Sequence, residues 1–342
     1  MTKNNNAPLD TLKRPLFDLR ISITDRCNFR CTYCMPSDIF PTDYGFLPKT
    51  TILSYEEIIK IATNFVELGV RKVRVTGGEP LLRKDVVQLV EGLNKIENLR
   101  EIGLTTNGVL LPKYAKQLKN AGLKRVNVSL DAINNDVFTK MNGNKGTVTD
   151  VLKGIDAALD AGLGVKINMV VRKGWNEQEI VPMAKYFKEK SNITLRFIEF
   201  MDVGASNGWR LDDVIPSKEI LNELQKFSQL EPVNPDYYGE VAKRYKYLDS
   251  DSEIGFITSV TETFCSSCTR IRISADGKIY TCLFASEGHD IKSIVRNGAT
   301  NDDIKDYIID VWNKREDRYS DVRHINTFPE KRKKIEMSYI GG

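Results

Sequence analysis

Short apolar runs rich in β-branched residues alternate with longer amphipathic stretches between Asp18 and about Phe200. This alternation is typical of a parallel sheet built from β–α units. It predicts six strands, each followed by a helical pattern: Leu19–Thr24, Lys72–Thr76, Glu101–Thr106, Arg125–Leu130, Val165–Val171 and Thr194–Phe200. No Gly-x-Gly-x-x-Gly follows the first strand, which disfavours a dinucleotide-binding sheet. An incomplete (β/α)6 TIM-like barrel, an α/β fold, fits the pattern better.

The pattern changes after Phe200, where Gly, Asn and Pro become frequent. Short strands are predicted near Gly255–Ser259, Ile271–Ser274 and Lys278–Cys282, followed by a helix from about Asn301 to Lys314. These elements predict a smaller C-terminal α+β layer. We therefore expect a mobile N-terminal arm over residues 1–15, a barrel over residues 16–204, and a C-terminal domain over residues 205–342.

Unusual residues recur where the predicted parallel strands end, which is where functional groups of β/α barrels gather. The segments that share this position are Cys27–Cys34 after the first strand, Gly77–Pro80 after the second, Thr105–Gly108 after the third, Ser129–Asp131 at the end of the fourth, and Met201–Gly204 after the sixth. Each one alone is as typical of a turn as of a site. Together they predict a single site at one rim.

The six cysteines fall into two groups of three, one near each end of the chain. The groups are Cys27, Cys31 and Cys34, and Cys265, Cys268 and Cys282. Three thiolates can hold a [4Fe–4S] cluster by three of its irons, which leaves the fourth iron open. Zinc is the alternative, but zinc sites usually take four ligands, and neither group has an adjacent fourth cysteine or histidine.

Composition narrows the class of protein. A disulfide framework suits a small secreted chain, whereas this one has 342 residues and a polar start without a charged-then-apolar leader. The cytosol is therefore the expected compartment. No apolar stretch approaches the roughly 18 residues that span a bilayer, so we expect no membrane contact. A net charge of +4 is too small to argue for nucleic acid, and the basic run Lys331–Lys334 is most typical of a solvated face.

Several motifs together resemble a known family. The Cys-x3-Cys-x2-Cys loop after strand one, with Tyr33 before its last cysteine, and the Gly-Gly-Glu-Pro after strand two are similar to those of radical S-adenosylmethionine (SAM) enzymes. The Cys-x2-Cys-Thr-Arg-Ile-Arg segment from Cys265, the later Cys282-Leu-Phe and the terminal Gly-Gly resemble the GTP 3′,8-cyclases of molybdenum cofactor (molybdopterin) biosynthesis. The resemblance runs from Phe17 to Gly342.

This resemblance implies two [4Fe–4S] clusters, with SAM on the open iron of the first and the purine of GTP on that of the second. The residues implied for SAM are Tyr33, Gly78, Glu79, Ser129 and Met201. Those implied for GTP are Arg20, Arg74, Thr105, Lys166, Arg270 and Arg272. No catalytic residue is implied beyond the cofactors, and the Gly-Gly tail is implied to enter the active site.

The implied activity is that of a lyase: abstraction of the ribose 3′ hydrogen, then attack of that carbon on C8 of guanine, giving (8S)-3′,8-cyclo-7,8-dihydroguanosine 5′-triphosphate. The implied partners are GTP, SAM, a one-electron donor, and a downstream cyclic pyranopterin monophosphate synthase that takes the product. A homodimer is one expected assembly.

Two other functions stay open. One is a radical SAM enzyme that modifies a peptide and carries an auxiliary cluster, although such auxiliary domains usually have more cysteines. The other is a non-catalytic iron–sulfur or zinc protein that senses redox state or scaffolds a partner. The second leaves the Gly-Gly-Glu-Pro and Arg-x-Arg placements unexplained.

Overall fold

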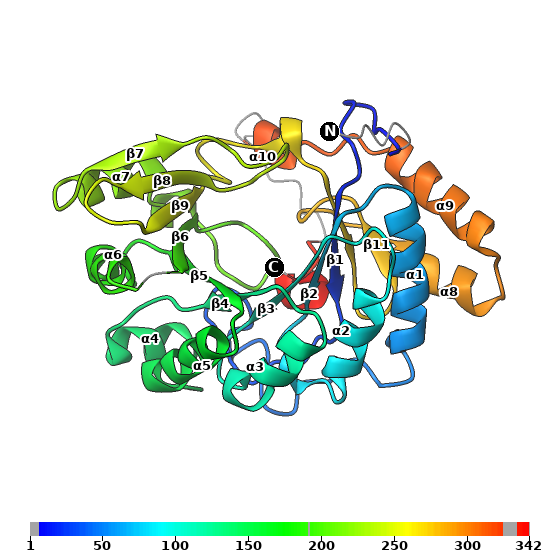
Figure 1. Ribbon diagram of the computed structural model, residues 1–342, viewed down its shortest axis with the longest axis horizontal. Helices are drawn as coiled ribbons and strands as arrows, with labels where there is room; N and C mark the ends of the chain where they lie inside the picture. Colours follow the sequence, from blue (N-terminus) through cyan, green and yellow to red (C-terminus); the bar gives the residue numbers. More distant parts are fainter. Residues whose placement is uncertain (1–6, 191, 324–333, 342) are drawn as a thin grey trace.

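A single open sheet of twelve strands organises the chain, and the computed structural model describes residues 7–190, 192–323 and 334–341 (Figure 1). Its order is β12-β11-β10-β1-β2-β3-β4-β5-β6-β9-β8-β7. The parallel strands are β1 (Asp18–Ser22), β2 (Lys72–Thr76), β3 (Glu101–Thr106), β4 (Arg125–Ser129), β5 (Gly164–Val171), β6 (Ile193–Glu199), β9 (Glu253–Ile257) and β10 (Arg270–Ile273). The edges are antiparallel, with β11 (Lys278–Tyr280) and β12 (His289–Asp290) at one and β8 (Lys243–Tyr247) and β7 (Leu230–Val233) at the other. The six predicted barrel strands are confirmed within two residues.

The C-terminal part differs from the expected layer in one respect. It does not lie beside the barrel sheet but extends it at both edges, because β10 pairs in parallel with β1 and β9 pairs in parallel with β6. Main-chain pairing between strands about 250 residues apart leaves no periodic signal in the sequence. As a result, the second group of cysteines is placed beside β1, next to the residues of the barrel rim.

Helices cover the outer face of the curved sheet. They are α1 (Tyr55–Glu67), α2 (Val86–Asn94), α3 (Leu111–Asn120), α4 (Asn135–Met141), α5 (Val148–Asp160), α6 (Ile180–Lys188), α7 (Ser217–Gln225), α8 (Ile291–Arg296) and α9 (Asn301–Asn313), with the short α10 (Tyr319–Val322) and α11 (Met337–Ile340) elsewhere. Helix α1 begins with a capping box of Ser54 and Glu57. None of the described helices is long and apolar enough to cross a membrane.

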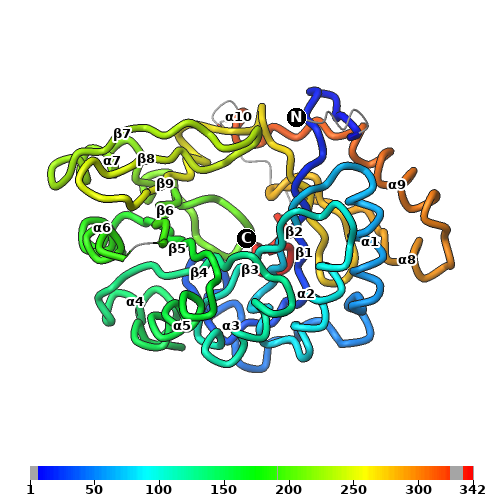
Figure 2. Tube along the Cα trace, viewed as in Figure 1, coloured from blue at the N-terminus to red at the C-terminus, as the bar shows by residue number. Residues whose placement is uncertain are grey.

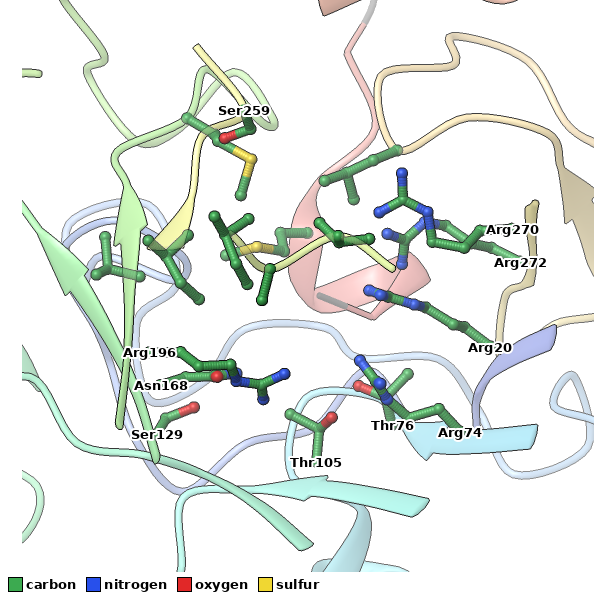
Figure 3. Close-up of a pocket in the computed structure, with 18 of the residues that line it drawn as sticks. Arg20, Arg74, Thr76, Thr105, Ser129, Asn168, Arg196, Ser259, Arg270 and Arg272 are labelled. Atoms are coloured by element: carbon green, nitrogen blue, oxygen red, sulfur yellow. The ribbon is translucent and has the colours of Figure 1, made fainter. Parts of the chain in front are cut away.

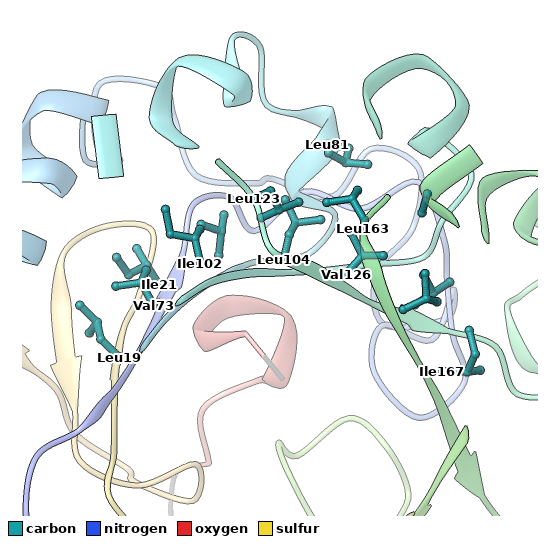
Figure 4. Close-up of a cluster of buried hydrophobic side chains, with 14 of the residues drawn as sticks. Leu19, Ile21, Val73, Leu81, Ile102, Leu104, Leu123, Val126, Leu163 and Ile167 are labelled. Atoms are coloured by element: carbon teal, nitrogen blue, oxygen red, sulfur yellow. The ribbon is translucent and has the colours of Figure 1, made fainter. Parts of the chain in front are cut away.

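The two faces of the sheet differ in polarity because side chains alternate along each strand. Leu19 and Ile21 of β1 and Val73 of β2 are buried in the apolar core between sheet and helices (Figure 4). Arg20, which lies between Leu19 and Ile21, and Arg74, which follows Val73, line the concave face instead. The apolar core therefore packs the convex face of the sheet against the helices, and the concave face is available for polar side chains.

The two chain ends are not free. The expectation of a mobile arm over residues 1–15 is wrong for the part of it that the structure describes. Asp10 and Arg14 are only 2% and 0% exposed, and the Arg14 carbonyl accepts a hydrogen bond from Trp312 Nε1 at 3.1 Å. Residues 1–6 lie outside the described residues. At the other end, α11 lies inside the curve of the sheet, and Ile340 is fully buried (Figures 1 and 2).

Candidate active site

One pocket on the concave face of the sheet brings the predicted site together (Figure 3). Every residue predicted for the two cysteine groups, for SAM and for GTP lines it. The cysteine loop after β1 is on one side of the pocket, and the segments around β10 and β11 are on the other. The residues predicted from both halves of the chain thus line a single pocket.

The first cysteine loop is held in a tight turn. The Cys31 carbonyl accepts hydrogen bonds from the amides of Cys34 and Met35, at 3.0 and 2.9 Å, and Cys27 Sγ accepts one from the Phe29 amide at 3.4 Å. Burial, and then the Glu79 carboxyl, raise the pKa of the Cys27 thiol to about 12. A nearby cationic centre is therefore needed before this thiol becomes a thiolate ligand.

The Gly-Gly-Glu segment braces that loop from β2. The Gly78 amide donates to the Thr24 carbonyl at 2.7 Å, and the Glu79 amide donates to the Arg26 carbonyl at 2.8 Å. A Cβ at Gly78 would lie 2.3 Å from the Arg26 carbonyl oxygen. Glycine is required here by the backbone of the cysteine loop itself, in addition to any approach of a ligand.

Two buried carboxyls secure the rim. Glu79 accepts hydrogen bonds from the Asn107 amide at 2.7 Å and from Thr106 Oγ1 at 2.8 Å, as expected for an acceptor at this strand end. Burial raises its pKa to about 7 despite these bonds. Asp131 accepts a hydrogen bond from the Tyr33 hydroxyl at 2.8 Å, and burial raises its pKa to about 6. Asp131 thus fixes Tyr33 beside the first cysteine group, a role that its place at the end of β4 hinted at.

Two arginines make the surroundings of the second cysteine group electropositive. Arg270 donates to Cys268 Sγ from Nη2 at 3.1 Å, and Arg315 donates to the same sulfur at 3.2 Å. Burial alone would raise the pKa of this thiol, but the two guanidiniums outweigh it and lower the pKa to about 6. Cys268 is therefore a ready thiolate, whereas burial raises the pKa of Cys282 to about 12.

Three arginines stand side by side on adjacent strands. The register pairs Arg20 of β1 with Arg272 of β10 on one side and with Arg74 of β2 on the other (Figure 3). Within the described part of the chain, neither Arg20 nor Arg74 has a hydrogen-bond or ion-pair partner, and the Nε atom of each is buried without one. Burial, and then repulsion by Arg74 and Arg272, lower the pKa of Arg20 well below its usual value. Half-buried guanidiniums whose Nε atoms are buried in this state call for an anionic ligand.

A second polar row crosses the opposite side of the pocket. Lys166 and Asn168 lie two apart on β5 and share its inner face, and Asn168 is paired in register with Arg196 of β6. Burial, and then Arg125 and Arg196, lower the pKa of Lys166 to about 8. Asn168 and Arg196 were missed from sequence, although continuing the period of two from Lys166 finds the first of them.

The C-terminal tail closes the inside of the pocket. The Gly341 carbonyl accepts a hydrogen bond from Arg272 Nη1, and Met337 packs on the buried Tyr33–Phe200 cluster. Gly341 has φ +74°, and a Cβ there would lie 2.1 Å from Thr76 Cγ2. The tail thus spans from the first cysteine group to the arginine row. Gly342 lies outside the described residues.

The donor sets fit the implied cofactors. All six cysteines are free thiols that face the pocket, three from each side. Among the residues that the structure describes, no three His, Cys, Asp or Glu side chains converge on a single ion. Soft thiolates in groups of three suit an iron–sulfur cluster with one open iron. Asn168 Oδ1 is buried without a partner and adds a free acceptor to the cavity.

Comparison with known proteins agrees with this geometry. Residues 21–187 match the Radical SAM superfamily, and residues 193–321 match the family Molybdenum Cofactor Synthesis C. The GTP 3′,8-cyclase of Staphylococcus epidermidis is 54% identical over 335 residues, which are 97% of this chain and 98% of that protein. That of Staphylococcus aureus is 49% identical over the same shares. The crystal structure of Streptococcus suis SuiB bound to S-adenosylmethionine has the same fold, with a TM-score of 0.61 and 14% identity over 92% of this chain and 69% of that chain.

Proposed function

We propose a function for this pocket from one premise: the chain belongs to the GTP 3′,8-cyclase family of radical SAM enzymes. It is a lyase that converts GTP to (8S)-3′,8-cyclo-7,8-dihydroguanosine 5′-triphosphate, an early step of molybdenum cofactor biosynthesis. It uses SAM and two [4Fe–4S] clusters. The observation that carries the assignment to this pocket is that it is lined by two groups of three cysteines and by Arg20 and Arg74, whose buried Nε atoms have no hydrogen-bond partner in the described structure.

The SAM end of the pocket is built around the first cysteine group. Cys27, Cys31 and Cys34 hold the first cluster. The residues that surround SAM are Tyr33, Gly78, Glu79, Ser129 and Met201. When bound, the cluster and SAM supply the one-electron chemistry that removes the 3′ hydrogen atom from GTP. The protein's part is orientation: Asp131 fixes the Tyr33 ring through its hydroxyl, and the Gly-Gly-Glu backbone fixes the cysteine loop.

The GTP end is built around the second cysteine group. Cys265, Cys268 and Cys282 hold the second cluster, and the guanine lies against it. Arg20 and Arg74 bind the triphosphate, since both lack partners of their own. The remaining contacts to GTP come from Thr105, Lys166, Arg270 and Arg272, all of which line the same pocket.

Arg270 and Arg272 have divided roles in this arrangement. Arg270 already donates to a cysteine sulfur, so it holds the cluster ligand as well as facing the nucleotide. Arg272 donates to the Gly341 carbonyl, so it couples the nucleotide site to the C-terminal tail. With Ile340 fully buried beside it, the tail excludes water from the space between the two ends of the pocket.

The remaining proposals concern the setting of the reaction. A one-electron donor reduces the enzyme in the cytoplasm, and a cyclic pyranopterin monophosphate synthase takes the product, with a homodimer as the assembly. Free thiols at all six cysteines support a reducing compartment. We also propose a division into two domains at residue 204, although the two family matches change over earlier, between residues 187 and 193.

An anaerobic turnover experiment tests the proposal. The protein is reconstituted with iron and sulfide, supplied with SAM, dithionite and GTP, and assayed for 5′-deoxyadenosine and the cyclised nucleotide together. We expect both products in the complete mixture. Formation of 5′-deoxyadenosine with unchanged GTP would leave a radical SAM enzyme with another substrate, such as a peptide. Absence of both from cluster-loaded protein would favour a non-catalytic iron–sulfur protein.

Two matched variants test which cysteine group serves SAM cleavage and which serves GTP cyclisation. Cys31→Ala should abolish 5′-deoxyadenosine formation, because the first group then has only two ligands. Cys282→Ala should leave SAM binding intact and abolish the cyclised nucleotide. If both variants lost SAM binding equally, the division of roles between the two cysteine groups would be wrong.

A further inference from the structure

A buried ion network ties the N-terminal segment to the second cysteine group. Asp10 forms ion pairs with Arg14 at 2.5 Å and with Arg315 at 3.3 Å, and all three side chains are at most 1% exposed. Arg14 Nη1 donates to the Cys265 carbonyl at 2.8 Å. Arg315 Nη1 donates to the Cys268 carbonyl, also at 2.8 Å. One carboxylate therefore anchors two arginines, each of which holds the main chain of one cysteine.

The same arginines present unused donors toward the cluster site. Both line the pocket. Arg14 Nη2 is buried without a hydrogen-bond partner in the described structure. Arg315 Nε also lacks a hydrogen-bond partner there but lies 3.7 Å from Asp317 Oδ2 as an ion pair, and Arg315 Nη2 already donates to Cys268 Sγ at 3.2 Å. Buried N–H groups beside a cysteine sulfur are the donors that set the stability and reduction potential of an iron–sulfur cluster.

We propose that Asp10 is a positioning residue for the second cluster, acting through Arg14 and Arg315, and that the segment from Asp10 to Pro15 is part of that metal site. The segment is well placed for this role: the Asp10 carboxylate also accepts hydrogen bonds from the amides of Leu12 and Arg14, at 3.0 and 2.9 Å. Thr11 Oγ1 and its amide both donate to the Arg315 carbonyl. The inference rests on the proposed second cluster.

The alternative is that this network only anchors the N-terminus to α9 and the loop after it. A purely structural anchor would affect the stability of the whole protein and leave the properties of the bound cluster unchanged. The two roles differ in the rate at which the second cluster loses iron and in its reduction potential, so the test measures both.

The test isolates the second cysteine group. In the full chain with Cys27, Cys31 and Cys34 replaced by alanine, iron and sulfide are reconstituted anaerobically, and iron release to a chelator is followed by absorbance. Asp10→Asn should speed release roughly 10- to 100-fold. The control is Asp306→Asn, which removes an exposed carboxylate from α9, and it should leave the rate unchanged.

A second variant covers the case in which Asp10→Asn does not fold. Arg315→Lys keeps the charge but loses the two-pronged contact with Cys268, so we expect faster iron release and a more negative reduction potential. Circular dichroism of the apoproteins checks folding. Rates and potentials equal to those of the control in every folded variant would overturn the inference. If the parent chain without the first group bound no iron at all, the proposed second cluster itself would fail.

Discussion

Replacing Arg20 should stabilise the empty protein and weaken GTP binding at the same time. Arg20 lies between Arg74 and Arg272 in the strand register with its Nε buried, and Asp18 on the same strand is its anionic neighbour. Two charges about 5 Å apart, the spacing of adjacent strands, interact by about 3 kcal/mol at an effective dielectric of 20. Repulsion by Arg74, Arg272 and Arg270 against attraction to Asp18 leaves a net cost of about that order, before the cost of burial.

Arg20→Met removes this cost and fills a similar volume. We expect the free energy of unfolding of the apoprotein to rise by about 1–3 kcal/mol. Loss of a charge-assisted contact worth about 1.5–3 kcal/mol should weaken GTP binding roughly 10- to 150-fold. Urea unfolding measures the first effect, and the GTP-dependent rise in melting temperature of the cluster-loaded protein measures the second.

Arg125→Met is the matched control, because Arg125 lies in the same sheet, on β4, but is paired with Glu101 at 2.7 Å. Its replacement should destabilise the apoprotein by about 1 kcal/mol. If Arg20→Met destabilised the apoprotein as much as the control does, Arg20 would be a structural residue, and the reasoning from unpaired cations would be refuted.

The remaining predictions concern the rim, the lysine and the tail. Gly78→Ala should destabilise the protein by about 1–3 kcal/mol because its Cβ meets main chain, whereas Gly45→Ala, with open space around it, should be neutral; equal effects in urea unfolding would contradict this. Because burial and nearby arginines lower the pKa of Lys166 to about 8, its ammonium is mostly present near pH 7 and is lost as the pH rises through 8. GTP affinity should therefore hold up to about pH 7 and fall by up to tenfold per pH unit above about pH 8, and Lys166→Gln should flatten this part of the profile. Glu336 accepts hydrogen bonds from the Ala205 amide at 2.9 Å and from Ser206 at 2.6 Å, so Glu336→Gln should speed carboxypeptidase digestion of the tail about tenfold; an unchanged digestion rate would show that this contact does not hold the tail.

Much of the fold was predictable because it depends on local patterns. The alternation of short apolar runs with amphipathic stretches located β1 to β6. The pairing of β9 and β10 with opposite edges of the barrel was not predictable, because strand pairing over long separations depends on the whole chain. The sequence therefore indicated a separate C-terminal layer where the structure has one continuous sheet.

The site, like the fold, was only partly predictable from the sequence. Cysteine spacing and strand-end position pointed to segments that line the cavity, and the resemblance to GTP 3′,8-cyclases implied the basic residues that line it as well. The positioning contacts were missed: that of Asp131, which lies in one of those segments, with Tyr33, and that of Asp10 behind the second cysteine group. A single buried carboxylate has no spacing rule of its own, and its role depends on a partner far along the chain. Because the Arg315 partner of Asp10 lies about 300 residues away, the polar start of the sequence by itself predicted a free arm.

Because β1 pairs with β10, the two halves of the chain cannot finish folding at the same time during synthesis. The first cysteine group needs only β1, β2 and their neighbours, so its loop can form as soon as the barrel half leaves the ribosome. The second group needs residues 10 and 315 in contact, a separation of 305 positions. Until β10 emerges, β1 has an exposed edge that β10 later covers, and the contact of Asp10 with Arg315 forms later still. Folding of this protein is therefore expected to finish with its second metal site, and a nascent chain would be able to accept iron at one end well before the other.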